Sequence, residues 1–237
     1  MSYIAITSNQ PRHREFINRL QKKVNLSLVI VVEKKKGNSQ FYCSEQLAFG
    51  GKKDPIRVNI VECTPVQLNS KRMAELITDV RPEVCFVFGA PLLKENIFRI
   101  PRRGCINIHT GLVQHHRGVD SPYWALYERR PELLGATLHY IDSSIDGGDI
   151  ISQAITKDLK VTDSPDDIFM KTCATGFDIL EESVYNILDD SVEAHPLSQY
   201  GNRGKLYQNK DMDYGIMLEI RYKTPHVLKE YLNGNNS

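Results

Sequence analysis

The stretch CINIHTGLVQHHRG, residues 105–118, begins as a buried strand and ends in polar side chains. Its first part, Cys105–Ile108, is apolar enough to be covered on both faces, as strands of parallel sheets are. Asn107 and His109 are two residues apart, so the amide and the imidazole point to the same face. Ligands of open parallel sheets bind beyond the carboxyl ends of the strands. We therefore predict a functional site at the end of this strand.

Upstream of this stretch, strand and helix patterns alternate. Short apolar runs predict strands, and apolar residues at helical spacing predict the helices between them. Strands separated by helices imply right-handed crossovers and a mostly parallel α/β sheet. We predict strands at Tyr3–Thr7, Leu28–Val32, Val58–Val61, Val84–Phe88 and Cys105–Ile108, and helices at Pro11–Val24 and Ser70–Val80.

The segment Glu33–Lys53 breaks the alternation. It holds three consecutive lysines at 34–36 and the run Gly50-Gly51-Lys52-Lys53. We interpret the segment as a solvated loop or extended hairpin, since charge runs are usually solvated. Contact with an anionic substrate is the alternative.

Downstream of His109 the pattern changes to a smaller set of elements. Ser164 or Asp163 can cap a long helix, and Pro165 fits its first turn. We divide the chain into a core of residues 1–190 and a short C-terminal extension of residues 191–237. The predicted elements are a short helix Ser121–Tyr127, strands Gly135–Ile141 and Ile150–Ile155 joined by SSIDGGD, a helix Ser164–Leu188, a polar link Ser198–Asp213, a short helix starting at Thr224-Pro225, and a frayed end Asn233–Ser237.

Composition narrows the class of protein. Lys+Arg is 30 and Asp+Glu is 29, and this net charge of +1 argues against a dedicated nucleic-acid binder. No apolar run approaches the roughly 20 residues that span a bilayer, and the first ten residues lack the features of a signal peptide. We expect a cytoplasmic protein that binds neither membrane nor nucleic acid.

Cysteine and histidine spacing gives no sign of a metal. The five cysteines include no CxxC pair, which excludes the usual disulfide frameworks and zinc sites. Cys85 and Cys105 lie in predicted strands, where we expect them buried and inert. His115, His116 and Asp120 match no common ligand spacing, and we expect the two histidines to be loop residues near the site. The prediction is that no metal is bound.

A carboxylate completes the candidate chemistry. Asp146 lies in the turn DGGD, where glycines let the backbone approach a ligand closely. An amide and a protonated imidazole can donate to an oxyanion, and a carboxylate can orient the imidazole and assist proton transfer from an amine. This set suits acyl transfer, and without a GxSxG motif direct transfer is the simpler mechanism. Taken singly, the Asn-x-His pair and the DGG turn also have structural interpretations.

The motifs resemble those of a known family when they are taken in order. The order resembles the catalytic core of formyltransferases that use N10-formyltetrahydrofolate, over roughly residues 3–190. The resemblance implies a Rossmann-like formyltransferase fold, with Asn107, His109 and Asp146 as catalytic residues and N10-formyltetrahydrofolate as co-substrate. The motifs are Asn107-Ile108-His109, Arg117-Gly118, Gly135-Ala136-Thr137-Leu138-His139 and Asp146-Gly147-Gly148-Asp149-Ile150.

The resemblance also implies where the two ligands bind. The pterin ring would lie between residues 89–98 and 141–146, with apolar walls and backbone groups that recognise its edges. The acceptor would lie opposite, beside the loop His115–Trp124, where Trp124 could equally belong to the core. The expected folate residues are Pro91, Leu92, Leu93, Phe98, Ile141, Asp142 and Ile145, and the expected substrate residues are Arg117, Gly118 and Tyr123.

Departures from the relatives indicate the acceptor. Thr7–Pro11 replaces the glycine-rich loop that binds phosphate in glycinamide ribonucleotide transformylase. The tail after residue 189 is shorter than the tRNA-binding domain of methionyl-tRNA formyltransferases, and the first strand begins at Tyr3, without the regulatory domain of formyltetrahydrofolate hydrolases. We therefore expect a nucleotide-linked amino sugar, formylated for a cell-surface glycan. Glycinamide ribonucleotide, methionyl-tRNA and a non-catalytic folate-binding protein are the alternatives, and a homodimer is left open.

Overall fold

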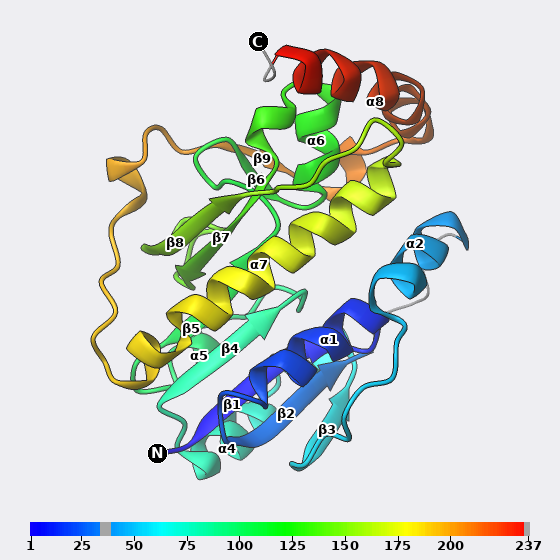
Figure 1. Cartoon of the computed structure of the whole chain (residues 1–237). Helices are drawn as coiled ribbons and strands as arrows, with labels where there is room; N and C mark the ends of the chain where they lie inside the picture. The colour runs from blue at the N-terminus through cyan, green and yellow to red at the C-terminus, as the bar shows by residue number, and fades with distance from the viewer. Residues whose placement is uncertain (34–38, 235–237) are drawn as a thin grey trace.

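The computed structural model describes residues 1–33 and 39–234. Its centre is a 7-stranded sheet in the order β3-β2-β1-β4-β5-β7-β8, with helices on both faces (Figure 1). The pairs among β1 to β5 are parallel, whereas β7 pairs antiparallel with β5 and with β8. The predicted mostly parallel α/β fold is therefore confirmed. The strands are β1 (Tyr3–Ser8), β2 (Leu26–Val32), β3 (Ile60–Cys63), β4 (Val84–Phe88), β5 (Cys105–His109), β6 (His116–Gly118), β7 (Gly135–Tyr140), β8 (Ile150–Ile155) and β9 (Lys205–Tyr207).

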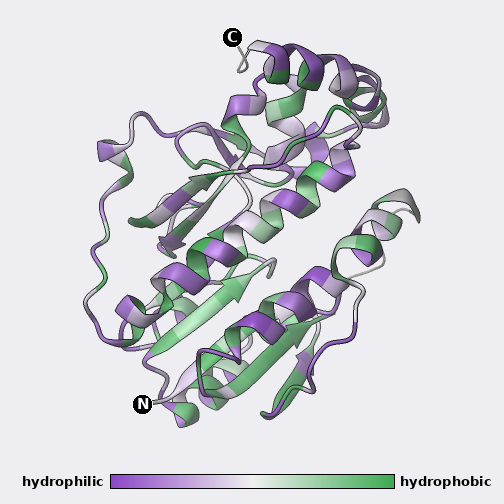
Figure 2. Cartoon of the chain, in the orientation of Figure 1, coloured by the Kyte–Doolittle hydropathy of each residue, from purple (hydrophilic) through white to green (hydrophobic). Residues whose placement is uncertain are grey.

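Two hydrophobic layers sandwich the sheet. Because side chains alternate along a strand, Ala5 of β1 faces one layer and Ile4 the other. α1 and α7 cover the first face, where Phe16 and Phe177 are buried, and α4 covers the second (Figures 1 and 2). The helices are α1 (Pro11–Leu20), α2 (Ser39–Phe49), α3 (Pro65–Leu68), α4 (Lys71–Val80), α5 (Glu95–Phe98), α6 (Ser121–Tyr127), α7 (Pro165–Leu188) and α8 (Tyr214–Gly234), with 3-10 turns η1 (Pro131–Leu133), η2 (Leu197–Gln199) and η3 (Asn209–Asp211).

Local signals placed several helix ends correctly. The Ser164 hydroxyl accepts from the Asp167 amide at 3.1 Å and forms a capping box, so α7 begins directly after it. Ser70 caps α4 in the same manner through the Met73 amide at 3.2 Å. Cys85 and Cys105 are buried on adjacent strands, as predicted.

The predicted loop at Glu33–Lys53 is wrong for residues 39–49, whereas residues 50–53 are neither helix nor strand. Ser39–Phe49 is the helix α2, and Lys34–Lys36 lie outside the described residues. Tertiary contacts hold this helix: Glu45 is buried and pairs with Arg12 of α1, and Phe49 packs against Phe177 of α7. The prediction missed these contacts because runs of lysine are usually exposed to solvent, and the sequence pattern does not show which residues between them are buried.

The C-terminal extension also differs from the prediction. The last helix begins at Tyr214, and Pro225 lies inside it. Ile220 and Leu228 are buried on either side of the proline. Their packing stabilises one continuous helix although Pro225 has no backbone N–H to donate. The polar link contains β9, which pairs in parallel with β6. The predicted frayed end lies partly in α8 and partly, at 235–237, outside the described residues.

Smaller differences concern element ends. The third strand is Ile60–Cys63, two residues beyond the predicted Val58–Val61, and α1 ends at Leu20. Within the described residues, no helix is both long and apolar enough to span a membrane.

Candidate active site

Asn107 and His109 lie at the carboxyl end of β5, as predicted. Antiparallel pairing of β5 with β7 places His139 directly opposite Asn107. The Asn107 Nδ2 atom is 3.1 Å from His139 Nε2, and His139 Nδ1 donates to the Tyr140 carbonyl at 2.9 Å. That second bond leaves Nε2 as the acceptor for one N–H of Asn107, so the other N–H is free to meet a ligand.

Asp146 reaches the same point from the turn between β7 and β8. Its backbone is left-handed, with φ of 47°, and its Oδ2 accepts from the Gly118 amide at 2.7 Å. Oδ2 is 3.4 Å from His109 Nδ1, and Oδ1 is 3.5 Å from His139 Nε2. The fold therefore brings the three predicted catalytic residues together and adds His139 between them.

Electrostatics keep Asp146 ionised. Burial by itself would raise the pKa of this carboxyl group. The neighbouring His109, His139 and Gly118 amide lower this pKa more than burial raises it, and they hold it well below the usual range. Burial lowers the pKa of His109, although the facing carboxylate opposes this. At neutral pH the site thus holds a carboxylate beside a neutral imidazole.

The ring of His109 is fixed from behind. Its Nε2 lies 3.0 Å from the His116 carbonyl oxygen and 3.1 Å from the Ser121 hydroxyl. Donation from Nε2 to the carbonyl leaves Nδ1 facing Asp146 as the atom that can take up a proton. A Cβ at Gly111 would come within 2.6 Å of His109 Nε2, so this glycine makes room for the ring.

Two clefts meet at these residues. The first cleft has a volume of about 690 Å³, and the second has about 420 Å³. Asn107, Gly118 and Asp146 line both clefts, and His109 lines the second. A reacting atom held at this boundary would be reached by one ligand from each side. The first cleft is also lined by Ala90, Pro91, Leu92, Leu93, Ile141 and Ile145, and the second by Gln10, Arg12, His13, Gly89, Thr110 and Phe169.

Most of the residues expected to hold folate line the first cleft, but two do not. Phe98 is 8% exposed and belongs to the core under α5. Asp142 accepts from the Ser144 amide at 2.7 Å and shapes the turn that leads to Asp146. Both follow the right loop in sequence, but the backbone turns their side chains away from the cleft.

The expected substrate residues divide similarly. Gly118 lines both clefts, at φ of 87°. Arg117 instead donates to the carbonyls of Gly204 at 2.8 Å and Ile145 at 2.9 Å, and thus braces the turn of Asp146. Tyr123 is 4% exposed and donates to Asp166 at 2.6 Å, so its ring belongs to the core rather than to a ligand site.

Trp124 and His116, which lie near or in β6, are also internal. Trp124 stacks on Tyr207 with 4.0 Å between ring centroids, which bears out its interpretation as a core residue. His116 is buried, and its Nε2 lies 2.9 Å from Glu128. Among the described residues, no group of three or more His, Cys, Asp and Glu side chains is arranged so that it could hold a metal ion.

Sequence reasoning missed several residues of the site. Thr137 and His139 were visible in the G-x-T-x-H run, yet no role followed from it. The buried Thr137 hydroxyl donates to the Gly111 carbonyl at 2.6 Å and holds the loop after β5. No local signal could place Leu206–Asn209 in the first cleft, because only the pairing of β9 with β6 brings them there.

These features define a class of protein. A Rossmann-like sheet carries an amide, an imidazole and a carboxylate between two clefts, which is the group set that acyl transfer needs. The chain belongs to the formyl transferase family, whose sequence pattern matches residues 3–183.

Individual relatives agree with this assignment. A methionyl-tRNA formyltransferase from Corynebacterium aurimucosum is 30% identical over 125 residues, which are 53% of this chain and 36% of that protein. The chain spans less than half the length of such curated relatives. The solved 4-N formyltransferase from Francisella tularensis has a TM-score of 0.64 at 18% identity, over 94% of this chain and 87% of its own. The N-formyltransferase from Helicobacter canadensis, in complex with folinic acid and dTDP-3-aminofucose, has a TM-score of 0.62 at 14% identity, over 98% of this chain and 82% of its own.

Proposed function

We propose that this protein transfers the formyl group of N10-formyltetrahydrofolate to the primary amine of a nucleotide-linked amino sugar. The observation that carries the proposal is the convergence of Asn107, His109 and Asp146 at the boundary of two clefts. One cleft can hold the donor and the other the acceptor, so that the amine and the formyl carbon meet between these side chains.

The first cleft suits the pterin of the donor. Apolar walls come from five residues, of which Leu92 is 65% exposed: Pro91, Leu92, Leu93, Ile141 and Ile145. Such a cleft, with backbone groups at its edges, is the usual form of a small-molecule site. Folinic acid in the complex of the Helicobacter relative supports a reduced folate as the donor.

The catalytic steps follow from the charges of the side chains. The unprotonated amine attacks the formyl carbon, a C–N bond forms, and the electron pair moves to the formyl oxygen. The free N–H of Asn107 donates to that oxygen. The proton lost by the amine passes to His109 Nδ1, which Asp146 stabilises once charged, and from there to the N10 nitrogen as the old C–N bond breaks. No covalent intermediate with the protein is required.

The acceptor rests on the relatives that match nearly the whole of this chain. The solved sugar N-formyltransferase from Shewanella matches 95% of this chain and the Helicobacter N-formyltransferase 98%, whereas the phosphoribosylglycinamide formyltransferase from Bacillus halodurans matches 80% and the methionyl-tRNA formyltransferase 53%. The Helicobacter complex contains a dTDP-linked amino sugar. Both observations favour a nucleotide-linked amino sugar over tRNA.

Product mass tests the proposal. The protein is incubated with N10-formyltetrahydrofolate and a panel of nucleotide-linked amino sugars, with glycinamide ribonucleotide and methionyl-tRNA as competing acceptors. We expect one formyl group to be added to at least one amino sugar. Formylation of either competing acceptor, with no gain on any amino sugar, would refute the proposed acceptor. No formylation in any mixture would refute the proposed reaction.

A further inference from the structure

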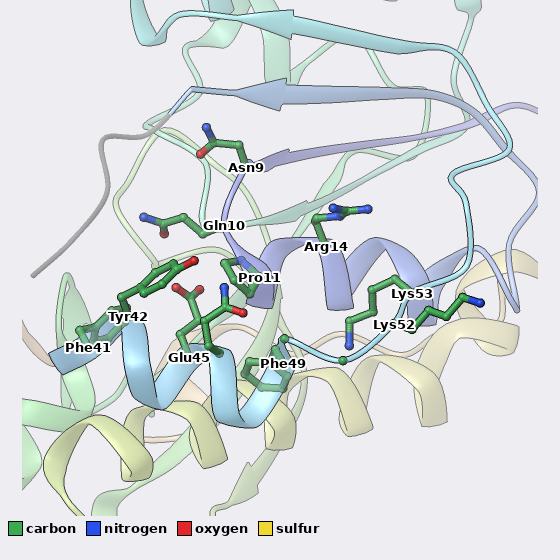
Figure 3. A pocket seen from close by; sticks show the side chains of 13 residues that line it. Asn9, Gln10, Pro11, Arg14, Phe41, Tyr42, Glu45, Phe49, Lys52 and Lys53 are labelled. Carbon is green, nitrogen blue, oxygen red and sulfur yellow. The ribbon is translucent and has the colours of Figure 1, made fainter. Parts of the chain in front are cut away.

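The first turn of α1 faces both the second cleft and a separate outer cavity between α1 and α2. Gln10 lines both, and Arg12 lines the second cleft. The outer cavity has a volume of about 540 Å³. Figure 3 shows Glu45 rising from α2 toward Gln10 and Pro11, with Arg14 and Lys52 toward the other end.

The amide groups of this turn can be accounted for one by one. Pro11 has no N–H, and the amides of His13 and Arg14 donate to the Gln10 carbonyl at 3.0 and 3.1 Å. The amide of Arg12 donates to Glu45 Oε1 at 3.3 Å, and the Arg12 guanidinium donates to the same oxygen. A strand followed by a helix N-terminus is a favourable place for an anion, because amide groups and the helix dipole converge there.

Glu45 is therefore an anion supplied by the protein itself. Its side chain is 2% exposed and that of Arg12 is 9% exposed, so the pair is fixed and withdrawn from water. The aromatic contact between Phe49 and Phe177 anchors the end of the same helix. A second anion at this turn would meet a carboxylate in a poorly screened environment, which is strongly unfavourable.

The outer cavity also contains positively charged side chains that lie farther from Glu45 (Figure 3). Lys53 pairs with Glu15 at 2.5 Å, but Arg14 and Lys52 form no ion pair with another described residue. Both are exposed at the cavity and can meet phosphate oxygens.

We propose that Glu45 is a specificity-determining residue: it occupies the anion position at the start of α1, rejects acceptors that place a phosphate there, and directs the acceptor's phosphates to Arg14 and Lys52. The proposal rests on the proposed function only for the identity of the acceptor. The occupation of the anion position can be tested without any transfer reaction.

Inorganic phosphate is the probe for the first test. Glu45→Ala removes the carboxylate and leaves Arg12 and its amide facing an empty position. By titration calorimetry and thermal unfolding, we expect this variant to bind phosphate at least about tenfold more tightly than the wild type, as charge-assisted hydrogen bonds predict. Its melting temperature should rise with phosphate more than that of the wild type.

Matched variants separate this effect from the mere release of a cation. Glu75→Ala frees the exposed Lys71 on α4 and should gain no phosphate binding. Arg12→Met combined with Glu45→Ala should lose the gain. If Glu45→Ala does not fold, Glu45→Ser also shortens the side chain and empties the position, and it should bind phosphate more tightly than the wild type. Equal phosphate binding by the wild type and the folded Glu45 variant would overturn the proposal.

Acceptor kinetics form the second test. Lys52→Ala should raise the KM for a nucleotide-linked amino sugar about tenfold, with the KM for the formyl donor unchanged. An unchanged acceptor KM in both Lys52→Ala and Arg14→Ala would refute the binding of the acceptor's phosphates by Arg14 and Lys52. The proposed function would still stand. A failure of the wild type to formylate any amino sugar would refute the proposed function and leave the phosphate result valid.

Discussion

Replacing Asp146 by asparagine removes one charge from the site and little else. The asparagine side chain has the same shape, and its Oδ1 can still accept from the Gly118 amide, which is 2.7 Å away in the wild type. What is lost is the anion 3.4 Å from His109 Nδ1. The variant therefore tests whether proton transfer depends on that charge.

The size of the effect follows from the role of the charge. Without the carboxylate, a proton on His109 is no longer stabilised, and burial continues to lower its pKa. Loss of a positioned acid–base group costs about a hundredfold or more in rate, and a hundredfold corresponds to about 2.7 kcal/mol in the activation free energy. We expect kcat to fall by at least this factor, with the Kd for the formyl donor within about threefold of the wild type, because asparagine keeps the shape of the cleft wall that Asp146 forms.

The assay is steady-state formyl transfer at pH 7.5, with donor binding measured separately by fluorescence or calorimetry. Asp149→Asn is the control, because Asp149 is an exposed carboxylate in the same turn. The Asp149→Asn variant should keep kcat within about threefold of the wild type, because substitutions on the surface usually have small effects. A folded Asp146→Asn protein that keeps kcat within tenfold of the wild type would refute the assignment of Asp146 as the stabilising anion.

Further predictions concern the same site. Asn107→Ala and His109→Ala should each lower kcat by at least about a hundredfold while the circular dichroism spectrum is retained, and near-normal turnover would remove that residue from the mechanism. Gly118→Ala would place a Cβ 2.1 Å from the Tyr207 carbonyl at φ of 87°, so urea unfolding should show a loss of about 2 kcal/mol or more; an unchanged midpoint would contradict the contact. Because the fold lowers the pKa of Asp146 below its ordinary 3.8, the ionised group adds stability above that pH and loses it as the pH falls through the folded value. The wild type should therefore lose more unfolding free energy than Asp146→Asn between about pH 5 and pH 3, and parallel curves would argue against the shift. Turnover should be unaffected by a chelator, and loss of activity that a divalent ion restores would reinstate a metal.

Local patterns predicted those parts of the fold whose formation depends on neighbours in sequence. The apolar run at Cys105–Ile108 forms a strand in any environment that can cover it, and Ser164 caps α7 through its own first turn. The spacing of Asn107 and His109 likewise places both side chains on one face, because side chains along a strand alternate. A period of two or of 3.6 is a property of the chain itself.

The directions of the side chains around the site could not be predicted from the sequence. Phe98, Asp142 and Tyr123 lie in the expected segments, but their side chains turn to the core or to the turn itself. Motif spacing gives the position of a residue along the chain, whereas the direction of a side chain in a loop depends on φ and ψ at each step. The role of Arg117 could not be predicted either. It donates to the carbonyls of Gly204 and Ile145, which come from two distant segments of the chain.

The sequence by itself determined the layered α/β architecture, the strand that carries Asn107 and His109, and the turn that carries Asp146. Only the tertiary structure decided that Asp146 comes within 3.4 Å of His109 and that α2 is a helix whose Glu45 occupies the start of α1. Periodicity records which face of an element is apolar, and that information is local. Ion pairs, cleft walls and pKa shifts depend on atoms brought together from distant parts of the chain, and no local pattern encodes those distances.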